Sequence, residues 1–147
     1  DTVNVSIIDT TQLVNNQKAF VWLYESATKS DTHYVSIQND TVTIFYDVDD
    51  TVPFAKYIFP LKVGNKWIRS LTTDSIVVVS KDTISVPAGV FEPAFLIEEE
   101  WYQLNAGVHI LTWLVPKVGI VKQKRFIFGW GPIEKTKWEL IDYFIKP

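Results

Sequence analysis

The chain has 147 residues, no cysteine and no methionine, and its 14 basic and 17 acidic residues give a net charge of −3. This length suits one domain over residues 1–147, which buries roughly 70% of its unfolded surface. The charge balance argues against nucleic acid as a partner, and the lack of cysteine excludes a disulfide framework. No apolar run reaches the length of about 18 residues that a transmembrane segment needs.

Segments rich in β-branched and aromatic residues follow one another along the whole chain and predict strands. In chain order they are residues 3–8, 19–26, 33–38, 41–47, 55–59, 67–70, 74–86, 91–102, 108–115, 120–128 and 137–145. The one candidate helix is the weak stretch 9–18, where Asp9 or Thr10 would cap the first turn. We therefore predict an all-β fold of about 10 strands with at most one short helix.

Short turn sequences separate these segments, among them Asn39-Asp40, Pro87-Ala88-Gly89 and Gly129-Trp130-Gly131-Pro132. Such short links join antiparallel neighbours, because parallel strands need crossovers of a dozen or more residues. In segments 108–115 and 137–145 apolar residues fall on both faces of the strand, so other parts of the protein must shield both faces from water. This pattern predicts a single antiparallel, strongly curved sheet, either a half-barrel or a barrel.

Four motifs stand in order in the last two-thirds of the chain. They are PL-x-x-G-x-x-W at 60–67, VPAG-x-F at 86–91, W-x-x-P-x-VG-x-V at 113–121 and EL-x-x-Y at 139–143. This set resembles a group of uncharacterised bacterial exported proteins and lipoproteins, which is similar in shape to the half-barrel of periplasmic lipoprotein carriers. The resemblance covers about residues 55–145 and implies a β-sheet wrapped around a cavity and an extracytoplasmic location, in the periplasm or at the cell surface. The missing initiator methionine agrees with a processed chain whose leader is not present. The motifs consist of turn and core residues, so the resemblance brings no catalytic residues.

The densest polar cluster is Glu98-Glu99-Glu100. In a strand, the two-residue period places Glu99 on the same side as Ile97 and Trp101. A carboxyl group buried there would have a raised pKa and would act as a general acid, or it would pair with Arg125 from a neighbouring strand. The alternative, which we favour, is a bulge or edge that turns all three glutamates to solvent, because charged residues are seldom buried unpaired.

Other catalytic and metal-binding patterns are weaker. A glycosidase would need a second carboxylate across a cleft from Glu99, for which Asp82 or Asp142 are the candidates. The run Asp47-Val48-Asp49-Asp50 lacks the glycine and distal glutamate of a calcium loop and predicts a solvated turn. His33 and His109 have no cysteines to complete a zinc site, and we expect each to be a strand residue with a satisfied hydrogen bond. We therefore predict no cofactor, no metal site and no catalytic residues.

Aromatic side chains are the remaining candidates for binding. Core packing is the default for each, but some of them would line a cavity for an apolar or sugar-like ligand. The set comprises Trp22, Tyr24, Trp101, Tyr102, Trp113, Trp130 and Trp138. Trp130 is the exception to core packing, because it lies between two glycines in a predicted turn and is expected to be an exposed contact.

These observations favour a non-catalytic, exported bacterial binding protein. Its expected partner is an apolar small molecule such as a lipid, or another envelope protein. The residues predicted to bind are Glu99, Trp101, Trp113, Arg125 and Trp130. Two alternatives stay open: a structural subunit of a cell-surface assembly that self-associates through strand edges or Trp130, and a carbohydrate-active hydrolase that uses Glu99.

Overall fold

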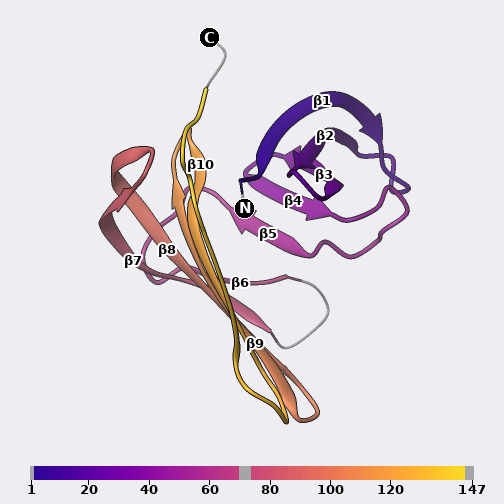
Figure 1. Cartoon of the computed structure of the whole chain (residues 1–147). Helices are drawn as coiled ribbons and strands as arrows, with labels where there is room; N and C mark the ends of the chain where they lie inside the picture. The colour runs from indigo at the N-terminus through magenta and orange to yellow at the C-terminus, as the bar shows by residue number, and fades with distance from the viewer. Residues whose placement is uncertain (1, 70–73, 145–147) are drawn as a thin grey trace. The chain divides into compact units, whose positions relative to one another are not determined.

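The computed structural model describes residues 2–69 and 74–144, and these residues form strands and no helix (Figure 1). The strands of this part of the chain are β1 (Asn4–Gln12), β2 (Lys18–Glu25), β3 (Ser30–Gln38), β4 (Thr41–Phe45), β5 (Ala55–Ile58), β6 (Lys66–Ile68), β7 (Ser75–Val86), β8 (Gly89–Gln103), β9 (Ala106–Val115), β10 (Gly119–Phe128) and β11 (Glu134–Glu139). They form two antiparallel sheets, in the orders β1-β2-β3-β4-β5 and β11-β10-β9-β8-β7-β6. Within each sheet, every strand pairs with its neighbours in the sequence.

The chain divides into two compact units, Asp1–Pro60 and Leu61–Pro147, and each unit carries one sheet. The prediction of an antiparallel all-β fold is confirmed, whereas the prediction of a single strongly curved sheet, half-barrel or barrel, is wrong. The hydrogen-bond ladder between β4 and β5 ends where Phe59 N donates to Asp40 O at 2.7 Å, because the next residue, Pro60, has no N–H to continue it. The following strand, β6, pairs with β7 of the second sheet. Folding of residues 1–147 as one domain stays a prediction.

The predicted helix at 9–18 is wrong. Residues 9–12 complete β1 and pair with the start of β2. A bulge between Ile7 and Asp9 shifts the register without ending the strand, and the β-branched pair Thr10-Thr11 favours extended backbone. Residues 13–17 then form the turn, in which Leu13 N donates to Gln17 O at 2.9 Å.

One small hydrophobic cluster of the first unit lies on one face of its sheet. Leu13, from the β1–β2 turn, is buried with Ala19 and Phe45, and Tyr34 and Val48 pack against them. The next residue of the turn continues this contact, because Val14 N donates to Val48 O at 2.9 Å. The β1–β2 turn is thereby fixed to the connection between β4 and β5.

In the second unit, three of the four sequence motifs meet in one hydrophobic cluster. VPAG-x-F forms the two-residue turn between β7 and β8, where Val86 pairs with Gly89, and W-x-x-P-x-VG-x-V forms the turn between β9 and β10. The buried members of the cluster are Val86, Phe91, Ala94, Val115 and Val121, with Ile84, Ala88, Trp113, Val118 and Leu140 packed against them. The prediction that these motifs reverse one extended segment into the next is confirmed.

The chain after β11 closes this end of the second sheet. Leu140 N donates to Val121 O at 2.8 Å, and Ala88 N donates to Leu140 O at 3.0 Å. Tyr143 lies beside Phe91, with ring centroids 5.8 Å apart. The EL-x-x-Y motif therefore joins the tip of the β7–β8 hairpin to β10. The predicted strand 137–145 differs from this arrangement: β11 starts at Glu134 and ends at Glu139. Residue 145, like residue 70 of the predicted strand 67–70, lies outside the described part of the chain.

We expect Phe91→Ala to lower the free energy of unfolding by about 3 kcal/mol, because it removes a buried ring from this cluster and leaves a cavity. The change is measured as the shift of the urea midpoint at constant m-value. Val90→Ala, at the exposed neighbouring position, is the matched control and should shift stability by about 0.5 kcal/mol or less. Equal losses in the two variants would contradict this role of the cluster.

Candidate functional site

Glu99 is buried in the middle of β8, with 4% of its surface exposed. It lies opposite Ile76 of β7 and Ile110 of β9, so apolar side chains flank its carboxyl group on both sides. Burial raises its pKa to about 7, and the Arg69 guanidinium acts in the opposite direction. The expectation that all three glutamates face solvent is wrong for Glu99, because β8 pairs with β9 without a bulge and only Glu98 and Glu100 lie on the opposite face.

Arg69 and Trp101 complete the surroundings of this acid. The guanidinium carbon of Arg69 lies 4.4 Å from the centroid of the Trp101 ring, a cation–π distance. Arg69 Nη2 is also 3.8 Å from Asp74 Oδ2, and both side chains are mostly buried. Glu99, Arg69, Trp101 and Asp74 form what we call the Glu99 cluster. It contains an acid that exchanges a proton near neutral pH beside a fixed cation.

The carboxylates that the sequence offered as partners of Glu99 lie elsewhere. Asp82 pairs with Ala94, five residues along β8 from Glu99. At about 3.3 Å per residue this is roughly 16 Å, beyond the about 5–9.5 Å that separates the two acids of a glycosidase. Asp142 follows β11, where its carboxylate accepts a hydrogen bond from Tyr143 N at 2.8 Å.

Arg125 and Trp113 are separate from the Glu99 cluster. Arg125 pairs with Ile110, so it shares the face of Glu99 but lies two strands away, and it is exposed. Trp113 pairs with Leu96 and therefore lies on the opposite face. There its ring lies 5.5 Å from Lys122 Nζ and 5.9 Å from Lys124 Nζ. The cation near Glu99 is therefore Arg69, the residue that directly follows β6, and not Arg125 as expected.

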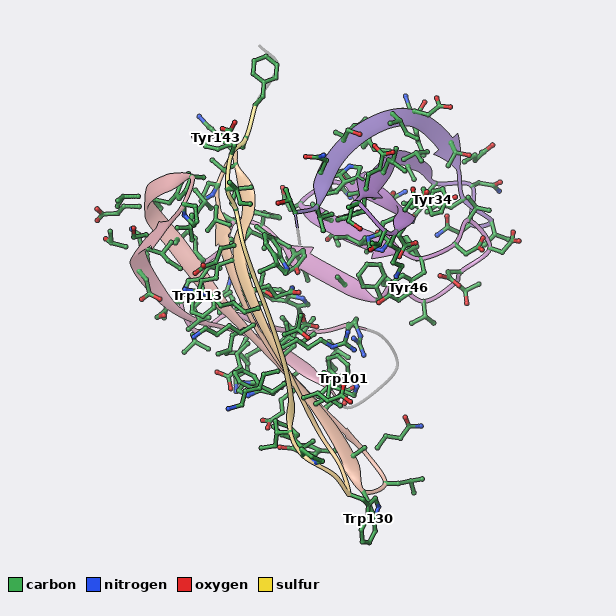
Figure 2. The ribbon with its side chains drawn as sticks, viewed as in Figure 1. Tyr34, Tyr46, Trp101, Trp113, Trp130 and Tyr143 are labelled. Carbon is green, nitrogen blue, oxygen red and sulfur yellow. The ribbon has the colours of Figure 1, made fainter. Side chains whose placement is uncertain are left out.

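Trp130 lies at the end of the second sheet, away from Trp101 and Trp113 (Figure 2). It is 90% exposed in the loop between β10 and β11. The β8–β9 turn is adjacent, since Phe128 and Tyr102 both pair with Gly107, and its residue Leu104 is 98% exposed. Tyr102 and Ile133 are also exposed at this end. We call the four residues Tyr102, Leu104, Trp130 and Ile133 the apolar tip.

The base of the apolar tip is closely packed around a glycine. A Cβ atom at Gly107 would lie 2.7 Å from Tyr102 Cδ1 and 3.0 Å from Phe128 Cδ2. The two rings therefore occupy the space over the bare Cα of Gly107, and any side chain there would displace them. This packing holds the β8–β9 turn and the β10–β11 loop next to each other.

The first unit contains a small pocket of about 170 Å³ that the sequence did not single out. Its lining comprises Val3, Tyr24, Ser26, Lys29, Asp31 and His33. This volume is below the roughly 300–1,000 Å³ of typical ligand pockets. One sequence signal could have located this pocket. Two alternating pairs, Trp22-x-Tyr24 and Asp31-x-His33, flank the tight turn from Ser26 to Lys29, and in the hairpin Tyr24 pairs with Asp31 and Trp22 with His33.

His33 is surrounded by rings in this unit. Its ring centroid lies 4.4 Å from that of Tyr24, 5.0 Å from that of Phe54 and 5.4 Å from that of Tyr46. Burial lowers the pKa of His33, Asp31 raises it and Lys29 lowers it. Burial, with a smaller contribution from Asp31, raises the pKa of Tyr24 to about 12. At neutral pH the pocket therefore presents neutral aromatic groups beside one ion pair, Lys29 Nζ to Asp31 Oδ2 at 3.7 Å.

The two histidines have weaker polar contacts than expected. His33 Nε2 is 3.9 Å from Asp31 Oδ2, an ion-pair distance too long for a hydrogen bond. His109 Nε2 is 3.3 Å from Glu98 Oε1 but lacks hydrogen-bond geometry, so the distance alone does not count as a bond. Residues 2–69 and 74–144 contain no group of three or more side chains suited to hold a metal ion.

No protein-family model, curated protein or solved structure matches this chain. Among the described residues there is no helix of the length and apolarity needed to cross a membrane. The residues predicted to bind thus lie at separate places: Glu99 with Trp101, Arg125 two strands away, Trp113 on the opposite face, and Trp130 at the apolar tip. The sequence reasoning missed Arg69, Asp74, Leu104 and the pocket of the first unit.

We expect the Glu99→Gln variant to be more stable than the wild type at pH 8 and equally stable near pH 4. The folded state keeps the Glu99 proton between its ordinary pKa of 4.5 and about 7, so the free energy of unfolding falls as the pH rises through this window. The penalty at pH 8 is on the order of 3 kcal/mol at most. Urea midpoints at the two pH values measure it. Glu92→Gln, at an exposed position of the same strand, should show no such divergence, and a less stable Glu99→Gln at pH 8 would refute the assignment.

The pKa of His33 should lie below its ordinary value of 6.5 and should fall further in Asp31→Asn, which removes the one neighbour that raises it. The contribution of His33 to stability is then fully present above pH 6.5 and decreases as the pH falls, because the unfolded state binds the proton more readily. A pH titration of the histidine ring protons by NMR measures both values, with His109→Gln to assign the resonance. A higher His33 pKa in Asp31→Asn would contradict the proposed surroundings.

Proposed function

We propose that this chain is a non-catalytic binding protein that meets its partner through the apolar tip. One observation carries the proposal: Leu104 and Trp130, in two adjacent turns, are 98% and 90% exposed. Folding gains almost nothing from an apolar side chain that stays in water, whereas burial against a partner gains about 1.5–3 kcal/mol for each such residue. Contiguous exposed apolar side chains typically mark a contact surface.

We further propose that the protein works outside the cytoplasm of a bacterium, in the periplasm or at the cell surface. Support for this location comes from the motif resemblance to exported and lipoprotein-like proteins. The absence of cysteine agrees with it without requiring it. A partner in the cell envelope, whether lipid or protein, follows from this location.

A carbohydrate-active hydrolase is a second candidate, because a carboxyl group with a pKa of about 7 suits a general acid. Its burial weakens this candidate, since only 4% of Glu99 is exposed to any substrate. In a hydrolase, Glu99→Gln abolishes turnover of the sugar substrate. In a binding protein, the same variant changes stability and leaves partner binding intact.

A structural subunit of a surface assembly would use the apolar tip to join copies. Light scattering coupled to size exclusion distinguishes this alternative. We expect a monomer whose mass does not depend on concentration, and a concentration-dependent oligomer that Trp130→Ser dissolves would support the assembly.

Photo-crosslinking in the cells that make the protein tests the proposed function. A benzophenone amino acid replaces Trp130 in one variant and the exposed Val79 of β7 in the matched control. We expect adducts from position 130 that are absent from position 79, and mass spectrometry then identifies the adduct as lipid, protein or a second copy. Equal yields at both positions, or no adduct at position 130, would refute the apolar tip as the contact surface.

A further inference from the structure

The apolar tip is a small and convex feature. It consists of one tight turn, in which Gln103 pairs with Ala106, and of the adjacent loop between Phe128 and Glu134. An aromatic side chain buries about 150–250 Å², so two aromatic and two aliphatic residues cover less than the about 800 Å² that each partner contributes to a stable protein interface. A soft apolar phase accepts such a protrusion without a matching cavity.

The residue types of the apolar tip match a bilayer interface. Trp130 and Tyr102 have amphipathic rings of the kind that concentrates at the level of lipid headgroups, where one edge is apolar and the other is hydrated. Leu104 supplies a purely apolar side chain that projects from the neighbouring turn. Two glycines flank Trp130, so no adjacent side chain shields its ring.

Leu104 has a backbone conformation that favours other residues. Its φ of 53° lies in the left-handed region, which costs a residue with a Cβ about 1–2 kcal/mol and which glycine, asparagine and aspartate tolerate best. A leucine here costs folding free energy and buries nothing within the described structure. The cost is offset only where this side chain enters an apolar medium outside the protein.

The charges behind the apolar tip are balanced. Counted from the tip, the first row with an exposed charge holds Glu134, the second holds Glu100 and Lys135, and the third holds Arg125. A surface that binds anionic lipids needs an excess of basic residues, at about 1 kcal/mol for each. Equal numbers of both signs favour a zwitterionic bilayer, with apolar insertion as the main source of affinity.

We propose that the apolar tip inserts Leu104 and Trp130 into the headgroup region of a lipid bilayer and holds the protein at the membrane surface. This assignment rests on the proposed function and names the partner of the same surface. The rest of the second sheet stays outside the bilayer, because the charged side chains behind the tip remain hydrated.

Flotation of the full chain with phosphatidylcholine vesicles tests the assignment. The tip variant combines Leu104→Asn with Trp130→Ser, and the control combines Val79→Ser with Val90→Ser, which removes exposed apolar side chains elsewhere in the same unit. We expect wild type and control to float equally and the tip variant to bind at least about 10-fold more weakly. Adding phosphatidylserine or raising the salt should change binding by less than about 2-fold.

Stability measurements separate loss of binding from loss of fold. Leu104→Asn should raise the urea midpoint, since asparagine tolerates the left-handed backbone, while it weakens vesicle binding. No flotation of the wild type, equal loss in the control, or binding that disappears with salt would overturn the assignment to lipid. A protein adduct at position 130 without flotation would overturn the assignment to lipid but leave the apolar tip as the contact surface. Absence of any adduct at position 130 would overturn the assignment to lipid and the proposed function together.

Discussion

Backbone hydrogen bonding between strands that are neighbours in the sequence is the constraint on which the rest of the structure depends. Each ladder fixes which residues face each other, and thereby which side chains share a face. The regular pairing of β8 with β9 turns Glu99 inward beside Ile76 and Ile110 while Glu98 and Glu100 lie on the other face. A slip by one residue would bury two carboxylates in place of one.

The strands and most of the turns could be predicted from sequence, because β-branched runs and Gly, Pro and Asn act locally. The helix at 9–18 failed since Thr10 and Thr11 prefer extended backbone once β2 is there to pair with them. The division into two sheets was not predicted, because it depends on the interruption of the β4–β5 ladder at Pro60. Arg69 was missed for a similar reason: its approach to Trp101 depends on the pairing of β6 with β7, which leaves no signal near Glu99 in the sequence.

Three of the four motifs lie away from the candidate sites of the second unit, whereas Trp67 of PL-x-x-G-x-x-W shares a cross-strand row with Ile76 and Glu99. VPAG-x-F, W-x-x-P-x-VG-x-V and EL-x-x-Y supply the cluster at the end of the sheet where Leu140 contacts the β7–β8 turn. The Glu99 cluster lies farther along β8, and the apolar tip lies where β8 and β10 end. These three motifs therefore build the end of the sheet that holds the β7–β8 turn, and the apolar tip lies at the end that holds the β8–β9 turn.

The hydrogen bond from Ala88 N to Leu140 O has a kinetic consequence. The β7–β8, β8–β9, β9–β10 and β10–β11 pairings each start from a short connection, and the bond from Leu140 N to Val121 O extends the last of them. The Ala88–Leu140 bond instead joins segments separated by two complete hairpins and has the larger loop-closure entropy. We infer that it forms last. Until then the end of the sheet exposes Phe91 and Val121 to water, so the nascent or stressed protein is most prone to aggregate from this end.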